Sequence, residues 1–190
     1  MTTRQRTRDE RVQQLLDKQD IHECIVKAAR AMDRLDEELW AQAWHPDGTD
    51  DHGGWIGPAE QFIKKSLLRV PRWRRFQHYL LNQSIDLDGD VAHVETYFWA
   101  TLLHLDDDWA DYSVGRYLDR VERRDGRWAI AHRLTTLEWT GVLPPRPDGG
   151  GKAPSPDLFV RGAHDRTDRS YDRPLVLDRA FRNLYDDVAD

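Results

Sequence analysis

The sequence predicts an α+β fold, with helices in the first third of the chain and an antiparallel sheet after them. Apolar residues recur at helical spacing between Leu15 and Met32. Residues 76–139 are rich in β-branched and aromatic types and are divided by Asp-Gly turns. Helices followed by a β-meander are typical of the α+β class. Because 190 residues suffice for one sizeable core, we expect a single domain with an appendage.

Three helices are expected before the sheet. The first, Leu15 to Met32, is amphipathic, and Asp33 lies at its end beside the apolar stripe. A second, short helix covers Asp36 to Trp44. The third begins at Gly57-Pro58, since proline is favoured in the first helical turn, and ends before Pro71.

Four strands are expected after residue 75. Asp88-Gly89-Asp90 and Arg124-Asp125-Gly126 are hairpin signals, because Asp-Gly readily adopts the positive φ of tight turns. Strands this long twist and curl, and a curled sheet with helices on its concave side encloses a cavity. The expected strands are Phe76–Leu87, Val91–Leu105, Tyr112–Arg123 and Arg127–Trp139.

The composition changes after Trp139. We interpret residues 1–141 as the domain and residues 142–190 as a Pro/Gly-rich linker with a C-terminal extension. Apolar islands separated by charges predict that the extension docks, either over the cavity mouth or on a neighbouring subunit.

Composition excludes several classes of function. The net charge is −6, and the 28 basic residues are interleaved with 34 acidic ones, which argues against a nucleic-acid surface. Cys24 is the only cysteine, so no internal disulfide is possible, and it is expected to be a packed thiol. The eight histidines lack metal-ligand spacing. The polar N-terminus and the absence of a long apolar run predict a cytoplasmic protein without a membrane span.

Several short motifs between Leu15 and Thr140 occur together in a known group of proteins. They are Ala31-Met32-Asp33, Trp44-His45-Pro46-Asp47, Gly57-Pro58, His78-Tyr79 with Asn82, and Glu122-Arg123-Arg124-Asp125-Gly126-Arg127-Trp128 followed by Arg133. In these the chain resembles the SnoaL-like branch of the NTF2-like superfamily, and within it hexachlorocyclohexane dehydrochlorinase, scytalone dehydratase and bile-acid dehydratase. The joint presence of Asp33, His78 and Arg133 is the most specific part of the resemblance.

This resemblance implies an NTF2-like cone, in which a curved antiparallel sheet and N-terminal helices enclose a cavity. It also implies a reaction that uses no cofactor. It implies that His78 is the general base, that Asp33 orients and charges it, and that Arg133 stabilises negative charge on the leaving group. The long tail and many cavity positions depart from the family pattern, so neither substrate nor reaction type carries over. Taken alone, each residue also fits a structural role: a helix end, a strand histidine, a surface ion pair.

The residue types agree with proton-transfer chemistry. An imidazole titrates near ~6.5, and a neighbouring carboxylate fixes its tautomer and stabilises the imidazolium it becomes. The chain is also rich in aromatic residues, which are mostly core but could line a cavity for a flat or multi-ring apolar substrate. The candidate substrate-binding residues are Trp44, Trp55, Tyr79, Tyr97 and Trp99.

The function predicted is therefore a cofactor-independent lyase of a small aromatic, alicyclic or steroid-like compound. Proton abstraction would lead to loss of water, halide or a carbon fragment, such as formaldehyde from a lignin-derived diaryl diol. Open alternatives are an isomerase with the same dyad, a non-catalytic NTF2-like subunit of an aromatic-ring dioxygenase, and a ligand-binding protein. A homodimer or homotrimer is expected, because the open face of such a sheet is commonly buried on a second copy.

Overall fold

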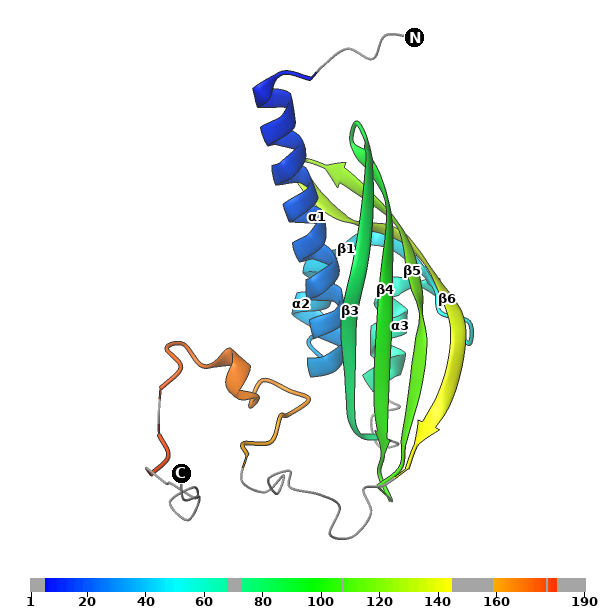
Figure 1. Ribbon diagram of the computed structural model, residues 1–190, viewed down its shortest axis with the longest axis vertical. Helices are drawn as coiled ribbons and strands as arrows, with labels where there is room; N and C mark the ends of the chain where they lie inside the picture. The colour runs from blue at the N-terminus through cyan, green and yellow to red at the C-terminus, as the bar shows by residue number, and fades with distance from the viewer. Residues whose placement is uncertain (1–5, 68–72, 107, 145–158, 177, 181–190) are drawn as a thin grey trace, which may run out of the picture.

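A curved sheet carries the long helix α1 along one face in the computed structural model (Figure 1). The model describes residues 6–67, 73–106, 108–144, 159–176 and 178–180. The segments predicted as linker (145–158) and as the end of the third helix (68–72) lie outside the described residues. The elements are α1 (Arg8–Arg34), α2 (Glu37–Ala43), β1 (Trp44–Asp51), β2 (Ile56–Pro58), α3 (Ala59–Leu67), β3 (Trp73–Asp88), β4 (Val91–His104), β5 (Ala110–Arg124), β6 (Arg127–Leu143) and the 3-10 turn η3 (Arg169–Tyr171).

Within the described residues the sheet has six strands in the order β2-β1-β6-β5-β4-β3. The predicted four-stranded meander is confirmed, and its two tight hairpins close at Asp88↔Val91 and Arg124↔Arg127. The sheet is mixed and not wholly antiparallel, because β1 pairs in parallel with β6. Residues 44–51 gave no strand signal in the sequence, since that segment is mostly polar and lacks β-branched alternation.

Helix α1 is longer than the apolar stripe predicts. A capping box formed by Thr7 and Glu10 begins it a full two turns before Leu15. These first turns project past the sheet (Figure 1), and Leu15 is 69% exposed. The helix ends at Leu35, which adopts a left-handed conformation, so Asp33 lies in the last turn as expected.

The main core lies between the helices and the concave face of the sheet. α1 contributes Ile21, Ile25 and Ala28, all fully buried, and Ile130 of β6 faces them. Cys24 lies in the same layer and its thiol donates a hydrogen bond to the Ala43 carbonyl at 3.0 Å. Burial raises the pKa of Cys24 to about 11, so this thiol is protonated at neutral pH and serves packing.

No helix within the described ranges is long and apolar enough to cross a membrane.

Gly115 of β5 lies where the backbone of β6 approaches it most closely. The register between β5 and β6 shifts between Val114 and Gly115. A Cβ atom built on Gly115 would lie 2.0 Å from the Thr136 carbonyl oxygen and 3.0 Å from the Phe98 ring. Only glycine therefore fits this irregularity without moving the backbone.

We predict that Gly115→Ala destabilises the protein by about 1–3 kcal/mol, because the added methyl group overpacks the sheet. Urea denaturation measures the change. Gly54→Ala is the matched control, since a Cβ there meets nothing within 4 Å. Equal midpoints for the two variants would contradict the packing argument.

Candidate active site

Asp33 and His78 form a direct pair between the end of α1 and strand β3. The Asp33 Oδ1 atom lies 2.7 Å from His78 Nδ1, and both side chains are mostly buried. The backbone N–H of His78 also donates to both carboxylate oxygens at 3.1 Å. Because an ionised carboxylate only accepts hydrogen bonds, Nδ1 must carry a proton, and Nε2 is the nitrogen left for a substrate.

His78 lines a cavity of about 440 Å³ between the helices and the sheet. The walls are mainly apolar, and Phe98, Ala100 and Leu102 of β4 supply one side through alternate positions of a single strand. The polar lining is sparse. Besides His78 it consists of His52, Ser66, Ser113, Tyr117 and Thr135.

Arg133 lies close to this cavity in the fold but is sealed off from it. Its guanidinium makes a bidentate ion pair with Asp119, with Nε to Oδ1 at 2.7 Å and Nη2 to Oδ2 at 2.8 Å. Arg133 is 4% exposed and is not among the described residues that line the cavity. The structure therefore does not bring Arg133 to the Asp33–His78 pair. The neighbouring residue His132 points to the opposite face of β6, as expected, and contacts Thr49.

Tyr117 separates Arg133 from the cavity. The guanidinium carbon lies 4.0 Å from the centre of the Tyr117 ring. Burial lowers the pKa of Arg133, but the charge of Asp119 and its hydrogen bonds outweigh this, so the pKa is raised and the group stays charged. Burial also raises the pKa of Tyr117, against the opposing effect of Arg133, so the phenol is neutral and can donate a hydrogen bond.

The aromatic candidates do not line the cavity. Trp44 is buried in the core and stacks on Trp40 at 5.1 Å, and Trp55 packs against the core under Lys65. Tyr79, Tyr97 and Trp99 lie on the other face of the sheet, because they alternate with the inward-facing His78, Phe98 and Ala100. Tyr79 and Tyr97 are 47% and 42% exposed. All five therefore lie away from the Asp33–His78 pair. Their aromatic character alone did not indicate which face of the sheet they occupy.

Sequence reasoning missed the residues that do face the dyad. Phe98 and Ala100 could have been found by register, since Ala100 is the partner of His78 across β3 and β4. His52 and Thr135 could not, because their proximity depends on the parallel pairing of β1 with β6.

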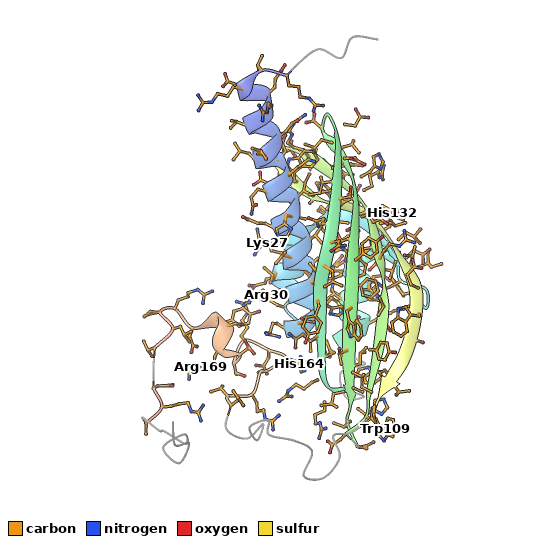
Figure 2. The ribbon with its side chains drawn as sticks, in the orientation of Figure 1. Lys27, Arg30, Trp109, His132, His164 and Arg169 are labelled. Carbon is orange, nitrogen blue, oxygen red and sulfur yellow. The ribbon has the colours of Figure 1, made fainter. Side chains whose placement is uncertain are left out.

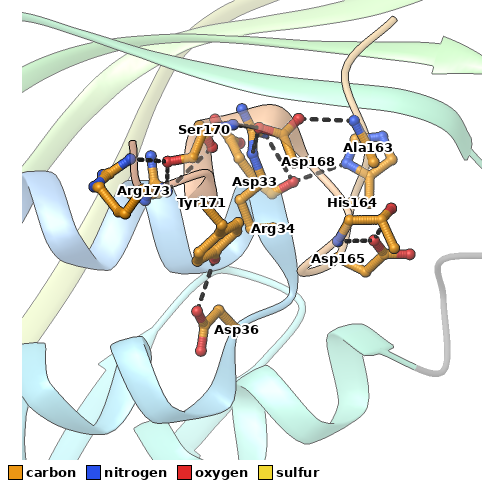
Figure 3. Close-up of polar contacts among 12 residues, drawn as sticks. Asp33, Arg34, Asp36, Ala163, His164, Asp165, Asp168, Ser170, Tyr171 and Arg173 are labelled. Carbon is orange, nitrogen blue, oxygen red and sulfur yellow. Dashed lines mark hydrogen bonds and ion pairs between the residues drawn. The ribbon is translucent and has the colours of Figure 1, made fainter. Parts of the chain in front are cut away.

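The described part of the C-terminal extension docks beside Asp33, as Figure 3 shows. His164 Nδ1 donates a hydrogen bond to the Asp33 carbonyl oxygen at 2.8 Å. The His164 ring also stacks on Phe76, a cavity-lining residue, with centroids 4.3 Å apart. Figure 2 shows His164 next to the C-terminal end of α1.

Polar contacts hold the rest of this segment on the helices. Asp36, which caps α2, accepts a hydrogen bond from the Tyr171 hydroxyl at 2.7 Å and pairs with Arg166 at 3.1 Å. Asp168 lies 3.3 Å from Arg34. Burial of Asp168 opposes ionisation, but hydrogen bonds from Ser170 and the Ala163 N–H, with the Arg34 charge, lower its pKa overall.

We predict that Asp168→Asn destabilises the protein by about 1–3 kcal/mol at pH 7, because a hydrogen-bonded carboxylate is lost. The pKa of Asp168 is depressed in the folded state, so its contribution is present above the unfolded value of about 3.9 and is lost as the pH falls further. Urea midpoints of variant and wild type should therefore converge below about pH 4. Asp20→Asn, an exposed change on α1, is the control, and a pH-independent difference for Asp168→Asn would contradict the assignment.

We predict that Arg133→Met costs about 3–5 kcal/mol, because it leaves the Asp119 carboxylate buried without a partner. The double variant Arg133→Met with Asp119→Leu should recover most of this loss, since it removes both charges. Equilibrium unfolding measures both. If Arg133→Met is as stable as the wild type, the argument that Asp119 needs a charged partner is wrong.

The described residues contain no group of three or more His, Cys, Asp or Glu side chains placed to hold a metal ion.

A family model described as a SnoaL-like domain matches residues 13–134. The chain therefore belongs to the SnoaL-like family. No curated protein matches the sequence.

Similar solved structures show the NTF2-like fold. A provisionally assigned scytalone dehydratase from Novosphingobium aromaticivorans is 20% identical, with a TM-score of 0.61 over 67% of this chain and 88% of its own. Hexachlorocyclohexane dehydrochlorinase LinA-type3 from Novosphingobium barchaimii is 18% identical, with a TM-score of 0.63 over 70% and 93%. An NTF2-like superfamily protein from Salmonella enterica is 19% identical, with a TM-score of 0.57 over 63% and 89%.

Proposed function

We propose that this protein is a lyase that begins an elimination by abstracting a proton with His78. The observation that carries the proposal is the 2.7 Å contact between Asp33 and His78 at the wall of a mainly apolar cavity. The resemblance of the fold to a dehydratase and a dehydrochlorinase supports the same reaction class.

The pair is built to act as a base at one nitrogen. Asp33 accepts the Nδ1 proton and so fixes the imidazole tautomer, which leaves the Nε2 lone pair for the substrate. When Nε2 takes a proton, the carboxylate stabilises the resulting imidazolium, as in other carboxylate–histidine pairs. A positioned base of this kind contributes about 10²–10⁴-fold in rate.

The cavity favours a small hydrophobic substrate. A volume of about 440 Å³ lies in the range of sites for small organic molecules, and aromatic side chains such as Phe76 and Phe98 offer ring surfaces. We infer an aromatic, alicyclic or steroid-like compound that loses water, halide or a carbon fragment such as formaldehyde. Tyr117, kept neutral, can donate a hydrogen bond to a developing oxyanion.

We infer that Arg133 does not take the role that the family resemblance implies. The guanidinium is paired with Asp119 and lies behind the Tyr117 ring. Its positive charge therefore influences the cavity only through the electrostatic potential at the Tyr117 hydroxyl. The five aromatic candidates are likewise replaced by cavity-lining residues of β3 to β6.

We predict that His78→Ala lowers turnover by about 10²–10⁴-fold with the fold intact, because the base is lost while the backbone contact to Asp33 remains. The wild type is incubated with three probes: hexachlorocyclohexane, a diaryl 1,3-propanediol and a two-ring β-hydroxy ketone. Mass spectrometry with chloride and formaldehyde assays follows the products, and circular dichroism follows the fold.

His93→Ala, an exposed histidine on β4, is the control and should keep wild-type turnover. A product of unchanged mass would indicate the isomerase alternative. Binding of all three probes without conversion would favour a ligand-binding protein, and co-purification with a larger iron-containing chain would favour a dioxygenase subunit. Near-normal activity of His78→Ala would defeat the proposal.

The homodimer or homotrimer and the cytoplasmic location stay predictions. Exposed aromatic side chains on the outer face of the sheet, including Tyr97 and Trp139, are the surface that a second copy would cover.

A further inference from the structure

The proposed elimination needs a group that assists departure of the leaving group, and Arg133 is sealed away from the cavity. The described polar residues of the lining include one other titratable nitrogen base, His52. It follows β1 directly and enters the cavity from the strand pair β1–β6, whereas His78 enters from β3.

His52 is held in a defined orientation. Its ring stacks on Phe62 of α3, with centroids 4.6 Å apart and planes 28° apart. The Nδ1 atom lies 3.1 Å from the Thr135 hydroxyl of β6. These contacts engage the ring face and Nδ1, so Nε2 is the nitrogen available to a ligand.

Asp50 gives His52 a buried negative neighbour. The Asp50 side chain is 1% exposed, and neither of its carboxylate oxygens has a hydrogen-bond partner among the described residues. Its Oδ1 atom lies 3.6 Å from His52 Nδ1. A buried carboxylate without partners is costly, and a positive charge on the adjacent imidazole offsets part of that cost.

The carboxylates beside the two histidines differ in their hydrogen bonds. The Asp33 carboxylate accepts hydrogen bonds from both the ring and the backbone of His78, and these satisfy its charge. Within the described residues the Asp50 carboxylate has no such donors, and buried Arg133 is a charge that interacts with it. The cavity thus has one imidazole fixed by a carboxylate through Nδ1 and a second one, on a different strand, beside a carboxylate that no hydrogen bond satisfies among the described residues.

We propose that His52 is the general acid of this cavity and protonates an oxygen leaving group while His78 removes the proton. The inference rests on the proposed function and narrows it to substrates that lose water or an alcohol, because a halide needs no proton. His78 Nε2 takes a proton from carbon, the C–H pair forms the double bond, and the C–O bond breaks. The oxygen keeps that electron pair and receives the proton of His52 Nε2. Exchange with solvent then returns a proton to His52 and removes one from His78, since their side chains are 31% and 14% exposed.

The test uses a series of β-aryloxy ketones that differ in the released phenol, from nitro- to methoxy-substituted. An acid matters little when the leaving group is weakly basic and strongly when it is basic. His52→Gln should therefore lower turnover less than tenfold for nitrophenol and about 10²-fold or more for methoxyphenol. His78→Ala should lower turnover across the whole series, and His93→Gln should change none of it.

An equal loss for every leaving group, or no loss, in His52→Gln would overturn the assignment of His52 while leaving the lyase proposal standing. A wild type that turns over none of the series would count against the lyase proposal instead. In that case the role of His52 is tested by ligand binding alone. The affinity for 4-nitrophenolate, followed by its absorbance, should fall about tenfold in His52→Gln. An unchanged affinity would refute the inference whatever the turnover, and circular dichroism confirms that each variant is folded.

Discussion

The Asp33 carboxylate joins the helical layer to the sheet, and the rest of the site depends on that joint. β3 is the edge strand of the described sheet, so its outward N–H groups face no neighbouring strand among the described residues. The N–H of His78 donates to Asp33 instead, and the His78 ring binds the same carboxylate. The contact that closes α1 over the sheet therefore also orients the His78 imidazole, and the backbone carbonyl of Asp33 accepts a hydrogen bond from His164.

The ion pair behind the cavity lining and the polar side chains in the lining differ in charge and in exposure to the cavity. Arg133 and Asp119 neutralise each other in the interior, where each alone would be costly. Tyr117 covers that pair and presents a neutral phenol to the cavity. Asp50 is the exception, because its buried carboxylate has no hydrogen-bond partner in the part of the chain that the structure describes, and it lies 3.6 Å from His52. The charge that reaches the cavity in this structure thus depends on which ion pairs are closed in the interior.

The helix periodicity and the Asp-Gly turns predicted the local elements well, and their limits show where local signals end. The two hairpins occur where Gly89 and Gly126 supply positive φ, a property of those residues themselves. Helix α1 begins earlier than its apolar stripe because a capping box stabilises exposed turns that bury nothing. Strand β1 is mostly polar and lacks β-branched alternation, and its parallel partner β6 lies more than 80 residues away.

The sequence by itself determined the α+β order, the family resemblance and the expectation that Asp33 and His78 meet, because each rests on local pattern or on motifs with definite positions. Only the tertiary structure decided which residues face the cavity. Alternation along a strand sorts side chains into two faces without saying which face the helices cover. It was the packing of α1 and α3 on one face that put Phe98 and His52 inside, left Tyr79 outside, and closed Arg133 onto Asp119.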